Sequence, residues 1–257
     1  MTPFYIFSTQ RSGSTVLIKT IDQHPEILCA GELFFPGHGI HHQEFQYPFF
    51  GKQLITNKKI LTVLNKPLLG SHVHKFLDTF YRCAGNDSKN AVGFKLMLGQ
   101  YNLSPAAFQK SLQDKKCILL IRKNLLRMAL SKIQASASKV YHVPAQEDEG
   151  KKLPENIQRK LRISPPHLYS MMQKLEADNN QLLNVAKDAL KIEYEEFSNW
   201  SKVIDKITVY LQVKQMDLSP ALRKIGDSSL ENTIENFDEV RNYILSSRFS
   251  YLIEGNF

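Results

Sequence analysis

The stretch that decides the fold is FYIFSTQRSGSTVL, residues 4–17. An apolar run, Phe4 to Phe7, ends at a group of small hydroxyl residues with one Gly and one Arg, and a helical pattern begins at Ser14. A strand, a tight turn of small residues and a helix form the geometry that holds phosphate, because backbone N–H groups and the positive end of the helix point at one spot. The stretch therefore predicts an anion-binding turn after the first strand of an α/β protein.

This turn lacks the lysine of a nucleoside-triphosphate loop. In the pattern G-x-x-x-x-G-K-[ST], the Lys reaches the terminal phosphates and the hydroxyl holds magnesium. Here Ser14 follows Gly13, and the nearby cation, Arg11, precedes the Gly. Ser12, Ser14 and Thr15 can still surround an anion together with the backbone N–H groups. We therefore expect one phosphate or sulfonate here rather than a triphosphate, although a plain helix cap is the structural alternative.

A second anion site is expected after the strand CILLI, residues 117–121. In P-loop nucleoside triphosphatases such a strand ends in an acidic residue that positions magnesium, whereas this one is followed by Arg122. Ser131 follows nine residues later, within a predicted helix. Arg122 and Ser131 can converge on one phosphate at the carboxyl ends of parallel strands, where α/β sheets bind ligands. A structural ion pair and a surface serine are the competing interpretations.

The order of the elements predicts an α/β fold. Strands separated by helices imply a parallel sheet flanked by helices, a P-loop-like three-layer sandwich. We expect one domain over residues 1–257, with a loop or lid inserted at about 35–53, where Gly, Pro, His and aromatic residues show no periodicity. The strands are expected over residues 4–8, 27–30, 91–96, 117–121 and 190–194. The helices are expected over residues 14–23, within 58–80, and over 125–138, 165–187, 200–211 and the tail 230–257.

Composition narrows the class of partner. Lys and Arg exceed Asp and Glu by 33 to 25 among the 257 residues, which suits an anionic ligand, but no basic block points to nucleic acid. The three cysteines are widely spaced without a CxxC pair, which argues against a disulfide framework or a zinc site. No stretch has the length or composition of a signal peptide or a membrane span, so we expect a cytoplasmic protein.

Taken together, the motifs resemble the family of sulfotransferases that use 3′-phosphoadenosine-5′-phosphosulfate (PAPS). Thr9 to Thr15 is similar to that family's loop for the 5′-phosphosulfate, and Arg122 with Ser131 is similar to its 3′-phosphate motif. Further similar blocks follow in the same order along the chain, and the acidic segment among them resembles the bacterial and carbohydrate-type branch. These blocks are Gly31–Phe34 (the acidic segment), Gly93–Met97, Ile192–Phe197, and Lys224 followed by Ile234–Phe237.

The resemblance implies sulfuryl transfer from PAPS to an acceptor hydroxyl, with adenosine 3′,5′-bisphosphate as product and no metal. It implies that the residues from Arg11 to Thr15, with Arg122 and Ser131, bind the donor, that Tyr194 contacts the adenine, and that Lys224 contacts the 3′-phosphate. Two departures are the turn Arg122-Lys123-Asn124, where the family has Arg-Asp-Pro, and Y-E-E-F at 194–197, where it has Y-E-D-L. The first departure keeps Arg122 and the second keeps Tyr194, the two residues expected to contact the donor.

The resemblance also suggests three catalytic residues. Glu32 is the expected base for the acceptor hydroxyl, Arg11 the residue that stabilises charge on the leaving phosphate, and Lys95 an additional positive charge near the sulfonate. His72 or His74 is the alternative base. For Glu32, the alternative is a carboxylate that caps the next element or pairs with a surface Lys. For Lys95, Tyr194 and Lys224, a structural or solvent-facing role remains open.

Three function classes remain open from the sequence. The first is the sulfotransferase, with a carbohydrate or other small-molecule hydroxyl as the preferred acceptor among sugars, lipid-linked glycans, phenols and peptide tyrosine. The second is a P-loop phosphotransferase, which magnesium dependence would distinguish. The third is a family member that binds nucleotide without turnover. The histidines at 38, 41, 42, 72 and 74 form no zinc motif such as H-E-x-x-H.

Overall fold

The fold, a computed structural model, is built on one five-stranded sheet in which every pair of neighbours is parallel. The structure describes residues 1–35, 45, 66–84, 89–138, 160–222 and 229–254. The strand order is β2-β3-β1-β4-β5. The strands are β1 (Thr2–Ser8), β2 (Ile27–Ala30), β3 (Ala91–Met97), β4 (Lys116–Ile121) and β5 (Leu190–Glu193). The predicted α/β class and parallel sheet are confirmed.

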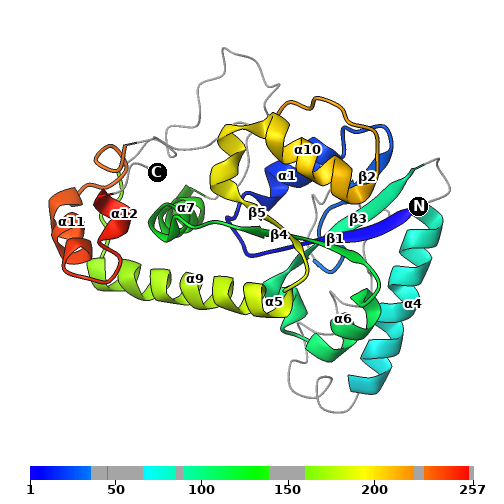
Figure 1. The fold of residues 1–257 in the computed structure, drawn as a ribbon. Helices are drawn as coiled ribbons and strands as arrows, with labels where there is room; N and C mark the ends of the chain where they lie inside the picture. The colour runs from blue at the N-terminus through cyan, green and yellow to red at the C-terminus, as the bar shows by residue number, and fades with distance from the viewer. Residues whose placement is uncertain (36–44, 46–65, 85–88, 139–159, 223–228, 255–257) are drawn as a thin grey trace.

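Helices cover both faces of this sheet (Figure 1). The helices are α1 (Ser14–Ile21), α4 (Lys66–Ala84), α5 (Leu98–Tyr101), α6 (Pro105–Leu112), α7 (Leu125–Ser138), α9 (Pro165–Val185), α10 (Trp200–Leu211), α11 (Phe237–Leu245) and α12 (Tyr251–Glu254). A 3-10 turn, η2 (Tyr194–Ser198), follows β5. The helices α1 and α10 pack on one face, and α4, α6 and the C-terminal end of α9 pack on the other.

The strand sequences explain the three layers. Along β1, Phe4 and Ile6 belong to the core under α1 and α10, while Phe7 belongs to the core under α4 and α6. All seven residues of β3 are buried, as expected for a strand covered on both faces. Each large apolar side chain fully buried in this way stabilises the fold by about 2–3 kcal/mol.

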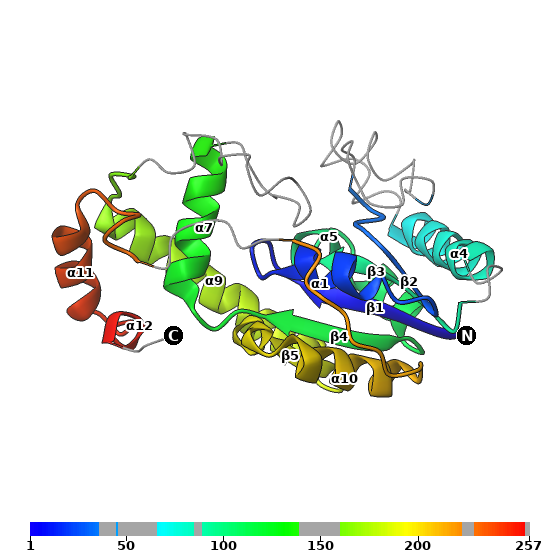
Figure 2. The same cartoon turned by 90° about the horizontal axis from the view of Figure 1, so that it is seen from above.

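A group of helices lies beyond the carboxyl end of β4 (Figure 2). Buried side chains of α7, α9, α11 and α12 form its core, including Met128, Leu168 and Leu252. The predicted helix over 230–257 is wrong at its start. Ile234 makes a parallel bridge to Leu161, and the Asn236 side chain pairs with the backbone of Ile163. These contacts hold an extended segment before α11 begins.

Two further differences concern element boundaries. The sequence reading left out α5 and α6, although Ser104 and Pro105 form a recognisable helix start, with Ser at the N-cap position and Pro at the first helical position. The strand β5 ends at Glu193, so Tyr194 begins the turn η2 instead of closing the strand. Residues 36–44 and 46–53 of the expected lid lie outside the described residues. None of the described helices combines the length and apolar character that a membrane crossing requires.

The register places the ends of four strands along one edge. Ser8 at the end of β1 pairs with Met97 and Leu120, and Ala30 at the end of β2 pairs with Phe94. The backbone N–H of Lys95 also donates to the carbonyl of Gly31. Residues that follow β1, β2, β3 and β4 are therefore neighbours, although they lie far apart in the sequence.

Candidate active site

The anion loop, Thr9 to Thr15, connects β1 to α1 through two residues in the left-handed backbone region. Arg11 has φ 65° and Gly13 has φ 92°. A side chain other than glycine is uncommon at positive φ, and such positions gather at ligand sites. Ser12 is fully buried, and its hydroxyl donates to the carbonyl of Thr9 at 2.8 Å. The Ser12 hydroxyl, expected from sequence to hold the anion, thus shapes the loop in this structure.

Glycine at position 13 is required by its neighbours as well as by its backbone angle. A Cβ atom there would lie 2.4 Å from the Cδ2 atom of Tyr194 and 3.1 Å from the Phe197 ring. The turn η2 therefore packs directly on the anion loop. This contact joins the first and fifth strands of the sheet across β4.

Arg11, Ser131 and Arg122 come together at the ends of β1 and β4. The Nε atom of Arg11 donates to the Ser131 hydroxyl at 3.0 Å, and the Nη1 atom of Arg122 donates to the Arg11 carbonyl at 3.3 Å. They belong to three separate segments: the anion loop, the residue after β4, and α7. The structure thus places the two anion motifs of the sequence side by side.

Arg122 is a buried cation with few partners. Its side chain is 9% exposed, its guanidinium carbon lies 4.2 Å from the centre of the Tyr194 ring, and its Nε atom has no hydrogen-bond partner among the described residues. Burial lowers the pKa of Arg122 below its ordinary value, while Tyr194 and Glu195 act in the opposite direction. No carboxylate in the described part of the chain forms an ion pair with Arg122. A buried cation in this state favours an anionic ligand.

The turn after β4 is held by residues that sequence reasoning missed. The carboxylate of Glu195 accepts hydrogen bonds from the backbone N–H groups of Lys123 and Asn124, at 3.1 and 2.9 Å. Asn124 in turn accepts from the N–H of Arg127 and caps α7. An Asn just before a helical pattern is a recognisable cap, so this signal was present in the sequence. The cap also gives a structural role to Asn124, which stands where the Arg-Asp-Pro pattern has Pro.

A second cluster lies at the ends of β2 and β3. The Lys95 ammonium is 2.8 Å from Oε1 of Glu32 and 3.4 Å from the hydroxyl of Thr15 in the anion loop. The amide nitrogen of Gln100 donates to Oε2 of Glu32 at 3.0 Å. Lys95 is 7% exposed, while the Glu32 side chain is 25% exposed and so remains accessible to solvent. The structure therefore joins Glu32 and Lys95 and links them to the anion loop.

Of the remaining candidates, one lies within the site, one lies on α4, and the others fall outside the described residues. Tyr194 packs against Gly13 and Arg122. His74 lies on an exposed side of α4 and pairs with Asp78 at 3.2 Å. Outside the described part fall Lys224, the side chain of His72, and the histidines at 38, 41 and 42. Within the residues that the structure describes, no three His, Cys, Asp or Glu side chains gather as metal ligands.

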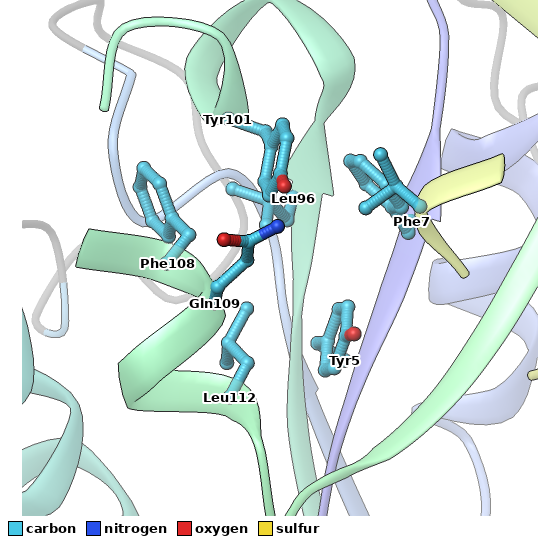
Figure 3. Close-up of a pocket in the computed structure, with 8 residues that line it drawn as sticks. Tyr5, Phe7, Leu96, Tyr101, Phe108, Gln109 and Leu112 are labelled. Atoms are coloured by element: carbon cyan, nitrogen blue, oxygen red, sulfur yellow. The ribbon is translucent and has the colours of Figure 1, made fainter. Parts of the chain in front are cut away.

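A small hollow lies on the face of the sheet that α4 and α6 cover (Figure 3). It encloses about 140 Å³ between β1, β3 and the helices α5 and α6. Its walls are Tyr5, Phe7, Leu96, Tyr101, Phe108, Gln109, Leu112 and Val185. None of these side chains is a cation or a carboxylate, so the hollow lacks the charge of the anion loop and of the Glu32 cluster.

Neither a family model nor a curated protein matches the chain. Three solved structures are similar to it. A sulfotransferase from Alicyclobacillus acidocaldarius is 16% identical, with 100% of this chain and 97% of that one covered and a TM-score of 0.47. The sulfotransferase domain of the Synechococcus PCC 7002 olefin synthase is 18% identical, with 93% and 82% covered and a TM-score of 0.46. Mouse sulfotransferase SULT7A1, complexed with PAP, is 15% identical, with 98% and 74% covered and a TM-score of 0.42.

The similar structures are sulfotransferases. With identities of 18% or less and TM-scores below 0.5, the likeness concerns the course of the chain and not its chemistry. What the site does has to be argued from its own residues.

Proposed function

We propose that the chain is a PAPS-dependent sulfotransferase that transfers a sulfuryl group to a hydroxyl of a carbohydrate or other small molecule. The observation that carries this proposal is Arg122, a buried cation without a carboxylate partner in the described chain, next to Arg11 and Ser131. PAPS carries negative charge at two separate positions, the 3′-phosphate and the 5′-phosphosulfate. The site offers two groups of anion contacts, the anion loop and Arg122 with Ser131, and a carboxylate beside them.

The donor contacts divide between these two groups. The backbone N–H groups of the anion loop, with Ser14 and Thr15, suit the 5′-phosphosulfate, because a helix N-terminus attracts negative charge. Arg122 and Ser131 suit the 3′-phosphate, since a phosphate would supply both a counter-ion and an acceptor for the Nε atom of Arg122, which has no partner in the part of the chain that the structure describes. Tyr194 holds Arg122 from the other side. Lys224, outside the described residues, stays a proposed contact of the 3′-phosphate.

The chemistry requires positioning and one proton transfer. When bound, PAPS supplies the activated sulfuryl group. Arg11 and the loop N–H groups stabilise the negative charge that develops on the leaving 5′-phosphate. Glu32 takes the proton of the acceptor hydroxyl as the new oxygen–sulfur bond forms and the bond between sulfur and the 5′-phosphate oxygen breaks. Lys95 holds the Glu32 carboxylate at the edge of the anion loop.

One contact favours a second candidate function, a P-loop phosphotransferase. The Lys95 ammonium reaches Thr15, so it places a cation beside the loop from a neighbouring strand. In a phosphotransferase, Lys95 would have to serve the terminal phosphates while it remains paired with Glu32 at 2.8 Å. Arg122, the residue after β4, also disfavours magnesium binding, because P-loop phosphotransferases usually have an acidic residue at that position.

Ligand-induced stabilisation separates these functions. The melting temperature is measured with adenosine 3′,5′-bisphosphate, AMP, ADP and ATP, each with and without magnesium. A ligand that binds the native state alone raises the melting temperature by mass action. We expect the 3′,5′-bisphosphate to stabilise the chain without magnesium, and the Arg122→Ala variant to lose that response. A response to ATP with magnesium, or to no nucleotide, would contradict the proposal.

Turnover is then tested with PAPS and representative acceptors. A simple sugar, 4-nitrophenol and a tyrosine peptide cover the acceptor classes, and release of the 3′,5′-bisphosphate is the common readout. Binding without release in the presence of every acceptor would favour the non-catalytic alternative. The cytoplasmic location stays a prediction, which fractionation of expressing cells checks.

A further inference from the structure

We infer that Gln100 is a positioning residue that fixes the orientation of the Glu32 carboxylate for proton transfer. This inference rests on the proposed function, because it assigns a task to Glu32 in the same reaction. It concerns a residue that the sequence motifs do not include. Three contacts carry it.

The first contact fixes the Gln100 amide itself. Gln100 is 9% exposed, and its Oε1 atom accepts a hydrogen bond from the backbone N–H of Met97 at 3.0 Å. Only the carbonyl oxygen of an amide accepts a hydrogen bond from an N–H group. The NH₂ group must therefore be on the opposite side, where Glu32 lies. A flipped amide would lose both hydrogen bonds.

The other two contacts fix the carboxylate. Gln100 donates to Oε2 of Glu32 at 3.0 Å, and Lys95 is 2.8 Å from Oε1. The terminal torsion of a glutamate side chain is broad, so one ion pair leaves the carboxylate free to turn. Two donors from different elements, β3 and α5, remove that freedom. Each oxygen keeps a second lone pair, which leaves Glu32 able to accept a proton.

Gln100 makes two contacts: it accepts from the Met97 N–H at the start of α5, and it donates to Glu32. Mutation can separate these two contacts. Gln100→Glu keeps an oxygen for the Met97 N–H but replaces the donor that faces Glu32. Gln100→Leu removes both contacts. Gln113→Glu is the matched control, because Gln113 is exposed at the end of α6 and receives the same added charge.

The assay uses the complete chain with PAPS and no added acceptor, so that water takes the place of the acceptor hydroxyl. Release of adenosine 3′,5′-bisphosphate then gives kcat and KM for PAPS without knowledge of the natural acceptor. Calorimetric titration with the bisphosphate measures donor-site binding separately. The ¹³C resonance of the Glu32 carboxyl, identified by its absence in Glu32→Gln, reports the surroundings of the carboxylate without any turnover.

We expect Gln100→Leu to lower kcat by about 10- to 100-fold while KM for PAPS and bisphosphate affinity stay within about twofold of wild type. In Gln100→Glu, two neighbouring carboxylates share one proton, so the acidic limb of the rate profile should move to higher pH. Both variants should shift the Glu32 carboxyl resonance. Gln113→Glu should change none of these quantities.

Two results would overturn the inference. One is an unchanged kcat and an unchanged Glu32 resonance in folded Gln100 variants. The other is an equal loss of bisphosphate affinity and kcat, which would show a general structural role. If the wild-type chain does not bind the bisphosphate at all, the proposed function fails and the inference falls with it. That outcome differs from a chain that binds and turns over normally with Gln100 replaced.

Discussion

Arg122 and Lys95 are both buried cations at the same edge of the sheet, but their surroundings differ. Lys95 has the Glu32 carboxylate at 2.8 Å, whereas Arg122 has a carbonyl and the face of Tyr194 and no carboxylate ion pair among the described residues. A buried charge without a counter-ion reduces the stability of the fold. An anion that binds at the end of β4 would therefore compensate the charge of Arg122, whereas Glu32 already compensates the charge of Lys95 at the end of β3. The first arrangement suits a donor phosphate, and the second suits proton transfer.

The largest effect is expected from Glu32→Gln. Turnover should fall by about 10²- to 10⁴-fold because the proton acceptor is lost, while bisphosphate binding should remain. The change also leaves Lys95 buried without its counter-ion, so the melting temperature should fall. The double variant Glu32→Gln with Lys95→Met should recover melting temperature but not turnover. Restored turnover in the double variant would show that Glu32 acts only through its charge balance with Lys95.

The next prediction compares the effects of replacing Arg122 and of replacing Lys95. Arg122→Ala should lower affinity for adenosine 3′,5′-bisphosphate by about 100-fold, since charged hydrogen bonds to a phosphate are lost. It should leave the melting temperature of the free chain equal or higher, because the change removes a buried charge that has no carboxylate partner among the described residues. Lys95→Met should lower that temperature. Calorimetric titration and thermal melts measure both quantities, and equal destabilisation by the two variants would remove the contrast between the two sides.

A smaller effect is expected at the contact between Gly13 and Tyr194. Gly13→Ala places a Cβ 2.4 Å from the Tyr194 ring at φ 92°, and should cost about 2 kcal/mol of the free energy of unfolding. Adding Tyr194→Ala should return part of that loss, because the clash disappears while the backbone strain remains. Chemical denaturation measures this. Additive losses in the double variant would show that the ring does not press on Gly13.

Tyr194→Ala alone should weaken bisphosphate binding by about fivefold, because the ring no longer holds the Arg122 guanidinium. Tyr194→Phe keeps the ring and serves as the control. A loss in the Phe variant as large as in the Ala variant would assign the effect to the hydroxyl and restore the expected contact with adenine.

The smallest effect is a pH dependence at the end of β5. Burial acts to raise the pKa of Glu193, but hydrogen bonds from Lys123 and Lys191 outweigh it, so the pKa lies below the usual 4.5. A lowered native pKa adds stability above about pH 4.5 that is lost as pH falls through the native value. Wild type should therefore exceed Glu193→Gln by about 2 °C in melting temperature at pH 6, with a smaller difference below pH 4. A difference that grows on acidification would contradict this sign.

Much of the fold was predictable because β1, β2 and β4 contain continuous apolar runs. The strand 27–30 and the helices 125–138 and 200–211 have the predicted bounds. The location of the anion loop and of Arg122 at one edge of the sheet also followed from the sequence, since the carboxyl ends of parallel strands share that edge. The hydrogen bond from Arg11 to Ser131 did not. The predictable features depend on local pattern and on a general rule of topology.

The supporting contacts were not predictable in the same way. Gln100 reaches Glu32 across 68 positions of sequence, and Glu195 reaches Asn124 across 71. Such contacts depend on the register of β2 against β3 and of β4 against β5, which one sequence does not reveal. The Ser12 hydroxyl shows the same limit on a smaller scale. Its residue type suits both an anion and the Thr9 carbonyl, and the backbone turn decides between them.

β1 lies in the middle of the sheet although it precedes the other four strands in the chain. Thr2 pairs with Ala91 and Phe4 with Lys116, so neither neighbour of β1 exists until much of the chain has left the ribosome. Contacts across such sequence distances close long loops and slow folding. The loop after β1 also needs Tyr194, which is made later still. β1 is thus made before its neighbours but is among the last strands to reach its native surroundings, and the anion loop lacks its contact with Tyr194 until residue 194 has been synthesised.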